Sequence, residues 1–230
     1  MSQPFPNDNI AKLLQRVRLS AEKSQKAHRT PILLAVSKTR PAADIRAAHA
    51  CGLNQFGESY LQEALDKIDQ LADLPITWHF IGPIQSNKTR PIAEHFQWVH
   101  SVAREKIARR LSEQRPTGLP PLQVCLQVNI SGEESKSGAS VEALPALAAL
   151  VDELPGLQLR GLMAIPAATD DEQEQRQAFA RLRRVFEALQ QDHPHMDTLS
   201  MGMSGDWEAA IAEGSTMIRI GTAIFGPRQR

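Results

Sequence analysis

Eight short apolar runs alternate with longer helical patterns along almost the whole chain. The strand-like runs are residues 32–38, 54–58, 77–82, 97–102, 122–130, 157–165, 198–203 and 216–226. The helical patterns between them are residues 43–51, 60–71, 88–95, 104–114, 141–154, 172–191 and 207–213, and another over about 9–27 precedes the first strand. Strands separated by helices pair in parallel, and eight such units are what a (β/α)8 barrel requires. The pattern therefore predicts the α/β class, as a single-domain (β/α)8 TIM-type barrel over residues 1–230 with an extra N-terminal helix.

An open doubly wound sheet is the alternative architecture for alternating strands and helices. Two features weaken it. No G-x-G-x-x-G stretch follows the first strand, and the units are evenly spaced over the whole length. No linker, low-complexity tract or block of charge divides the sequence, so we expect one domain.

The charge is balanced, with 26 basic and 26 acidic residues among 230. Such a chain has no electrostatic signature of nucleic-acid or anionic-membrane binding, and it lacks an apolar run of the roughly 20 residues that span a bilayer. Its start lacks the basic and apolar regions of a signal peptide. We therefore expect a soluble cytoplasmic protein. Cys51 and Cys125 are expected to be reduced thiols, and the histidines, including His193 and His195, lack metal-binding spacing, so no metal is predicted.

Lys38 is the first candidate functional residue. It follows Ile32, Leu34 and Val36 with a period of two, which places its amine on the same face as these apolar side chains. Loss of hydration lowers the pKa of a lysine, and a free amine is a nucleophile toward aldehydes. The sequence thus favours an imine-forming lysine. The alternative is a lysine that extends to water or pairs with Glu58.

A phosphate site is indicated after the seventh predicted strand. Residues 199–214 form a strand, a Ser/Gly/Met loop and a helix. Backbone N–H groups at the helix start, with the hydroxyls of Ser200 and Ser204, suit a phosphate dianion. Gly221 and Thr222 follow on the eighth strand, which matches the phosphate position of many barrels. The alternative is an ordinary turn with a helix cap.

Arg219 lies two residues before Gly221 and therefore on the same face of the last strand. A buried arginine needs a partner, which is usually a carboxylate. If an aromatic nitrogen heterocycle fills the barrel mouth, Arg219 instead donates to the ring nitrogen and keeps it unprotonated. Asp206 is expected to act as a helix N-cap turned away from the ligand.

An imine lysine, a phosphate cup and an arginine in one barrel together suggest a pyridoxal 5'-phosphate (PLP) site. The sequence closely resembles the pyridoxal phosphate homeostasis protein family, single-domain relatives of the alanine racemase N-terminal barrel. The resemblance rests on seven blocks in order: AVSKTRP (35–41), FGESYLQE (56–63), WHFIGPIQSNK (78–88), VNISGEESKSG (128–138), GLMAI (161–165), LSMGMSGDWEAAI (199–211) and IRIGTAIFG (218–226). It implies that Lys38 forms the Schiff base, that Ser200, Ser204, Gly221 and Thr222 surround the phosphate, and that Arg219 lies near the pyridine nitrogen. Ser59 stands where the family usually has asparagine.

Three further residues are candidates for cofactor binding. His79 is expected at a strand end, where its ring would stack on or bond to the ligand. Met203 lies in the phosphate loop, although a methionine there is more often a packing residue. Lys136, in the loop SGEESKSG, would reach the barrel mouth as a second amine that helps hand the cofactor in or out, unless it is a solvated lysine that balances Glu133 and Glu134.

The resemblance implies a protein that buffers or delivers PLP without established turnover. A slow PLP-dependent racemase or decarboxylase is the alternative, and a Schiff-base aldolase on a phosphorylated sugar is a third reading. Racemisation needs an acid/base group on each face of the imine, and the chain has one tyrosine, Tyr60. The expected partners are PLP and PLP-dependent apoenzymes, and a monomer is expected.

Overall fold

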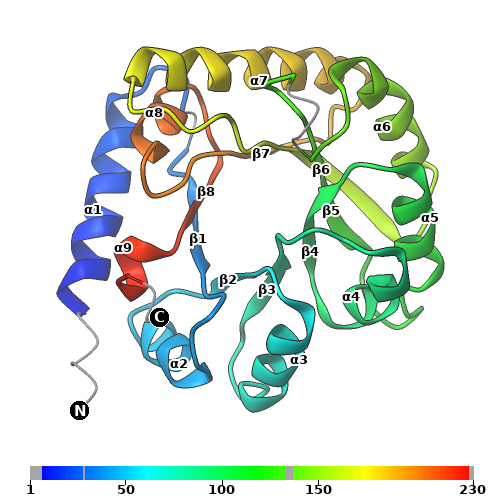
Figure 1. Cartoon of the computed structure of the whole chain (residues 1–230), viewed down its shortest axis with the longest axis horizontal. Coiled ribbons are helices and arrows are strands. Elements are labelled where there is room, and N and C mark those ends of the chain that lie inside the picture. The colour runs from blue at the N-terminus through cyan, green and yellow to red at the C-terminus, as the bar shows by residue number, and fades with distance from the viewer. Residues whose placement is uncertain (1–6, 28, 133–136, 228–230) are drawn as a thin grey trace.

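The computed structural model describes residues 7–27, 29–132 and 137–227, which form a closed barrel of parallel strands surrounded by helices (Figure 1). Neighbouring strands in the sequence are neighbours in the barrel, and the first strand pairs with the last. The strands are β1 (Ile32–Val36), β2 (Gln55–Glu58), β3 (Thr77–Phe80), β4 (Trp98–Val102), β5 (Leu122–Gln127), β6 (Leu157–Met163), β7 (Thr198–Ser200) and β8 (Met217–Ile220). The predicted barrel is confirmed.

The helices cover the outside of the barrel (Figure 1). They are α1 (Asn7–Lys23), α2 (Ala42–Ala50), α3 (Leu61–Gln70), α4 (Thr89–His95), α5 (Glu105–Glu113), α6 (Leu144–Asp152), α7 (Glu172–Asp192), α8 (Trp207–Ala212) and α9 (Thr222–Phe225), with 3-10 turns η1 (Ser86–Lys88) and η2 (Val141–Ala143). The extra N-terminal helix α1 lies against α8, where the Arg16 guanidinium is 2.8 Å from Glu208 and 5.2 Å from the centre of the Trp207 ring. None of the helices among the described residues is long and apolar enough to cross a membrane.

Period-two alternation in β1 divides its side chains between two environments. Leu33 and Ala35 belong to the core between the sheet and the helices, together with Ile45 and Ala48 of α2. Leu34 is fully buried and faces the inside of the barrel, where its side chain lies against Gly57. The alternation therefore builds two separate interiors, one under the helices and one inside the barrel.

The inside of the barrel is unusually polar. His79, His100, Ser200 and Arg219 are all buried there, where branched aliphatic side chains are the usual filling. Cys125 is also fully buried, and this burial raises the pKa of its thiol to about 12. Neither Cys51 nor Cys125 forms a disulfide within the described residues.

The predicted eighth strand, residues 216–226, is too long. β8 ends at Ile220, and residues 222–225 form the short helix α9, in which Ile224 and Phe225 donate N–H bonds to the Gly221 carbonyl at 3.0 and 2.9 Å. The composition of this segment, with threonine, isoleucine and phenylalanine, is typical of a strand. The glycine at the junction ends the strand and begins the helical turn.

Candidate functional site

Lys38 lies in a tight turn at the carboxyl end of β1. The turn runs from Ser37 to Arg40 and is closed by a 3.0 Å bond from the Arg40 N–H to the Ser37 carbonyl. Lys38 is half-buried there, and Thr39 has a positive φ of 65°, which is uncommon outside glycine. A backbone conformation of this kind costs energy and persists only where the surrounding structure enforces it, and such conformations cluster at functional sites.

A buried lysine on α3 holds this turn. The Lys67 ammonium donates to the Ser37 carbonyl and to Glu58, both at 2.8 Å, and to Glu63 at 2.5 Å. Glu63 also accepts the Thr39 N–H at 2.5 Å, while the Ser37 hydroxyl donates to Glu58 at 2.6 Å. The residues on both sides of Lys38 are thus tied to one charged cluster.

Burial and the Lys67 charge have opposite effects on the ionisation of Glu58 in this cluster. Glu58 is fully buried and Lys67 is 4% exposed. Burial raises the pKa of Glu58 above its ordinary value, although the Lys67 charge and the bonds from Lys67 and Ser37 act in the opposite direction. The second oxygen of Glu58 has no hydrogen-bond partner among the described residues. The ammonium is what makes a charged Glu58 tolerable here.

The pairing of β1 with β8 brings the phosphate candidates beside Lys38. Leu34 pairs with Arg219 in the strand register. Gly221 then lies against the Val36 backbone, so closely that a Cβ atom there would be 3.2 Å from the Val36 carbonyl oxygen. Thr222 begins α9 with an exposed side chain. A glycine at this position therefore lets the ends of β1 and β8 approach each other closely.

The loop between β7 and α8 also lies at this end of the barrel. Ser204 is exposed, and the Met203 N–H donates to the Asp206 carboxylate at 2.5 Å. Asp206 occupies the N-cap position of α8, but its side chain makes no capping bond, so the predicted capping role is wrong in that respect. The carboxylate instead folds back to stabilise the loop, and its burial raises its pKa.

Arg219 is held by neutral acceptors. Its guanidinium donates to the Ser200 carbonyl at 2.6 Å, to the Ser200 hydroxyl at 2.8 Å and to the Ala164 carbonyl at 3.0 Å. No ion pair within the described ranges involves Arg219, so the usual carboxylate partner is replaced. Burial lowers its pKa to about 10, which leaves it a cation at neutral pH.

A chain of buried hydrogen bonds continues from Arg219 through the barrel. The Ser200 hydroxyl lies 2.9 Å from His100 Nδ1, His100 Nε2 lies 2.9 Å from His79 Nδ1, and His79 Nε2 lies 2.6 Å from the Gln55 side-chain oxygen. The Gln55 oxygen only accepts, so a neutral His79 donates to it through Nε2 and accepts from His100 Nε2, which leaves His100 Nδ1 as the acceptor of the Ser200 hydroxyl, and the Ser200 oxygen itself accepts from Arg219. This direction fixes the tautomers of both histidines. Every donor in this series of hydrogen bonds has an acceptor.

His79 and His100 are both neutral at neutral pH. Burial lowers the pKa of His79 to about 3 and that of His100 well below its ordinary value. The His79 ring also stacks on Trp98, with the ring centres 5.3 Å apart and an angle of 13° between the planes. The rings therefore form a fixed, uncharged support under Arg219.

Two predicted cofactor-binding residues use their polar atoms inside the barrel. Ser200 was expected at the phosphate, but its hydroxyl is turned into the barrel and engaged by Arg219 and His100. His79 was expected at the mouth, but it is fully buried and both ring nitrogens are used by His100 and Gln55. Gln55 and His100 were missed altogether. Their signal is period two: Gln55 shares a face with Gly57, as His100 does with Trp98.

Other predicted positions lie around or outside this region. Lys136 lies outside the described residues. Ser59, which follows β2, is half-buried, and its carbonyl packs so closely on Gly82 that any side chain at Gly82 would overlap it. The strand ends at Lys38, Ser204 and Thr222 thus remain the described part of the candidate site.

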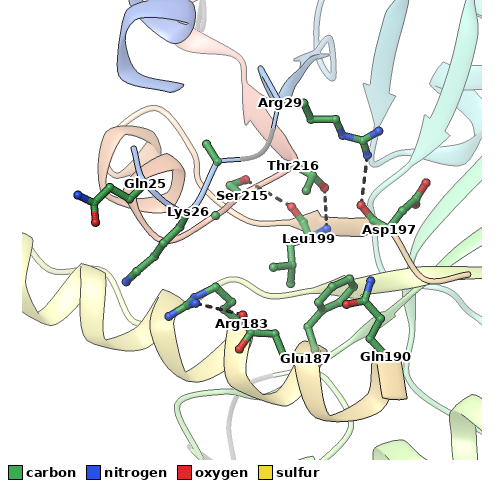
Figure 2. Close-up of a pocket in the computed structure, with 13 residues that line it drawn as sticks. Gln25, Lys26, Arg29, Arg183, Glu187, Gln190, Asp197, Leu199, Ser215 and Thr216 are labelled. Atoms are coloured by element: carbon green, nitrogen blue, oxygen red, sulfur yellow. Dashed lines mark hydrogen bonds and ion pairs between the residues drawn. The ribbon is translucent and has the colours of Figure 1, made fainter. Parts of the chain in front are cut away.

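A cavity of about 450 Å³ lies away from these strand ends (Figure 2). Its walls include Asp197 and Thr216, which directly precede β7 and β8, and Arg183 and Gln190 from α7. It therefore opens at the amino ends of the strands, whereas ligands of such barrels bind at the carboxyl ends.

Comparison with known proteins gives close matches over nearly the whole chain. Residues 9–229 match the family model described as "Alanine racemase, N-terminal domain". The chain is 66% identical over 221 residues to a protein of Pseudomonas aeruginosa named "Pyridoxal phosphate homeostasis protein", covering 96% of this chain and 95% of that one. It is 52% identical over 223 residues to the Escherichia coli protein of the same name, with the same coverage.

A solved structure supports the same relationship. PipY of Synechococcus elongatus, crystallised with PLP bound, matches with a TM-score of 0.83 and 39% identity, covering 96% of this chain and 99% of that one. The crystal form of PipY without PLP matches with a TM-score of 0.85 and 40% identity.

Proposed function

Because this chain belongs to the pyridoxal phosphate homeostasis protein family, we propose that it binds PLP and buffers or delivers the cofactor. The proposal covers residues 1–230 as one PLP-binding barrel. It places the protein in the cytoplasm as a monomer, and PLP-dependent apoenzymes are the recipients of the cofactor.

The single observation that supports this proposal is the closure of β1 on β8. It sets a half-buried amine, a buried cation and a glycine-lined hydroxyl at adjacent strand ends: Lys38, Arg219 and Gly221–Thr222. PLP presents an aldehyde, a ring nitrogen and a phosphate dianion, and each of these groups has a chemically matched residue here. The donor set therefore fits the cofactor.

Each residue has a separate proposed task. Lys38 supplies the amine that forms the Schiff base with the aldehyde, with loss of one water. Ser204 and Thr222 offer hydroxyls, and Gly221 gives access to backbone N–H groups, for the phosphate. Met203 contributes through the backbone of the loop that its bond to Asp206 holds.

Arg219 is proposed to donate to the ring nitrogen. Three of its five N–H groups are used by Ser200 and Ala164, and the bonds found among the described residues leave two. A cation that keeps its proton cannot protonate the ring, and an unprotonated ring is a weak electron sink. The pKa of about 10 keeps Arg219 charged at neutral pH. PLP supplies electron withdrawal in enzymes, and Arg219 in this role would hold it in a weakly reactive form.

A role without turnover follows from the same features. Racemisation requires a second acid/base group opposite the lysine. Tyr60, the tyrosine of this chain, is 53% exposed at the start of α3. We propose that the protein holds and releases the cofactor and does not transform amino acids. Slow racemase or decarboxylase activity is the competing function.

Reduction with borohydride followed by peptide mass spectrometry tests the binding proposal. We expect one phosphopyridoxyl group on Lys38, its loss in Lys38→Ala, and its retention in Lys106→Ala, which removes an exposed lysine from α5. An adduct that persists on another residue in Lys38→Ala would refute the assignment of Lys38.

Two solution assays test the role. The carrier function predicts that the loaded protein reactivates a PLP-free enzyme even when a trap for free aldehyde is present. It also predicts negligible deuterium exchange at the α-carbon of amino acids, whereas brisk exchange would identify an enzyme.

A further inference from the structure

A cluster of one aspartate and two histidines, residue types that can bind metal ions, lies at the opposite end of the barrel from Lys38. Asp152 is the last residue of α6, and His193 and His195 lie in the loop between α7 and β7. Both segments lead into the amino ends of strands, β6 and β7. The cluster is therefore separate from the candidate PLP site. The sequence did not indicate it because 41 residues separate Asp152 from His193.

The three side chains converge on one point. Asp152 Oδ2 lies 2.5 Å from His193 Nδ1, and Asp152 Oδ1 lies 3.0 Å from His195 Nε2. One ligand atom from each residue lies within 4.8 Å of the others. Ligand atoms around a tetrahedral zinc ion, each about 2.0–2.2 Å from the metal, are about 3.3 Å apart. The two nitrogen–oxygen distances, 2.5 and 3.0 Å, are shorter than this value, so the three side chains are close enough to surround an ion after a small outward shift.

The backbone holds the two imidazoles in place before any ion binds. The Met196 N–H donates to the His193 carbonyl at 3.0 Å, which closes a turn that has Pro194 at its second position. The Gln190 side chain donates to the Met196 carbonyl at 2.6 Å, and Gln190 projects from the last turns of α7 beside Asp197 in Figure 2. Proline fixes the φ angle between the histidines. These contacts restrain the backbone that carries the two histidines.

The charges around the cluster also favour a cation. α6 ends at Asp152 and α7 ends at Asp192, directly before His193, so the carboxyl ends of two helices meet here. The partial negative charge of a helix C-terminus stabilises cations. The exposed fractions of the side chains are 28% for Asp152, 10% for His193 and 39% for His195, which leaves one side open to a water ligand.

The geometry points to a binding site for a divalent transition-metal ion, with Zn²⁺ as the best match, held by Asp152, His193 and His195. Two imidazole nitrogens and one carboxylate oxygen form a common donor set for zinc. Ca²⁺ and Mg²⁺ prefer sites made only of oxygen ligands. The ion would link the end of α6 to the turn before β7. Each imidazole would bind through the nitrogen that faces Asp152, so the proton that this nitrogen donates to the carboxylate in the absence of an ion would pass to solvent or to the other ring nitrogen when the ion binds.

Titration with Co²⁺, which reports tetrahedral coordination by visible absorption, tests this site in the full chain loaded with PLP. We expect one Co²⁺ per chain, displaced by Zn²⁺ but not by Ca²⁺ or Mg²⁺. His195→Ala should weaken binding more than tenfold, because loss even of an outer-shell partner costs roughly 10- to 100-fold. Asp152→Asn should act in the same direction.

The matched control is His95→Ala, which removes another exposed histidine that bonds to its own helix backbone. It should bind Co²⁺ as the unmodified protein does. Equal Co²⁺ affinity in His195→Ala and His95→Ala would overturn the proposal, and so would the absence of tetrahedral absorption bands. His195 is exposed enough that its removal tests the site even if Asp152→Asn fails to fold.

Discussion

Lys67→Met is the substitution that most directly tests the charged cluster under the Lys38 turn. It leaves Glu58 fully buried with the Ser37 hydroxyl as its remaining donor. Removal of one partner from a buried ion pair costs about 3–5 kcal/mol. The remaining Ser37 bond places the expected loss at the lower end, about 3 kcal/mol at pH 8. Methionine keeps an unbranched side chain only one atom shorter than that of lysine, so the cost arises mainly from charge.

The pH dependence separates a charge effect from a packing effect. The pKa of Glu58 is already raised in the folded protein from its ordinary value of 4.5, and loss of Lys67 raises it further. Between the unfolded and folded pKa values, the folded state binds more protons, so its stability falls as pH rises, by about 1.4 kcal/mol per pH unit. The penalty of Lys67→Met is therefore expected to be smaller at pH 5.5 than at pH 8.

Urea unfolding followed by circular dichroism at the two pH values measures this penalty. Lys106→Met, at an exposed position of α5, is the control, with an expected change below about 0.5 kcal/mol. Lys67→Met combined with Glu58→Gln should recover part of the loss, because a neutral amide replaces the uncompensated carboxylate. An equal penalty at pH 5.5 and pH 8 would refute the electrostatic account.

Other parts of the structure give further expectations. The pKa of His79 is lowered to about 3 in the folded protein, so the free energy of unfolding should fall by about 1.4 kcal/mol for each pH unit below 6.5. Urea unfolding at pH 7 and pH 5 should show this slope, and His79→Gln should reduce the slope. Ser200→Ala should lower the free energy of unfolding by about 1–3 kcal/mol, because it leaves a buried imidazole nitrogen of His100 without its hydrogen-bond partner. Ser204→Ala, at an exposed position, should leave stability unchanged and weaken PLP binding in a spectroscopic titration. Gly161→Ala should prevent folding, as judged by circular dichroism, because a Cβ atom there overlaps a β7 carbonyl oxygen, while Gly118→Ala, with open space around it, should fold normally.

The architecture was predictable because it depends on local patterns. All eight strands and the helices α1 to α8 follow from the alternation of apolar runs, and the ends of most elements differ by only a few residues. α9 was missed because its residues favour a strand locally, and only the turn at Gly221 reverses that preference. The fold class could be predicted from the periodicity of the apolar residues alone.

The support of the site was less predictable because it depends on pairs far apart in the sequence. Arg219 and Ser200 were recognised as candidates, but their mutual bond and the link to His100 arise from strands that meet only in the closed barrel. The sequence did contain a signal that Lys67 is buried. It lies three residues after Ala64 and four before Leu71, on the buried stripe of α3, where a lysine is out of place.

The meeting of the first and last strands has a consequence for biosynthesis. Lys38 emerges from the ribosome long before Arg219 and Thr222. A nascent chain whose β8 segment is still in the exit tunnel cannot bring these residues together, however well its earlier units have folded. Capture of the cofactor at the proposed site therefore has to wait for β8, and translation products truncated before this strand should not bind PLP.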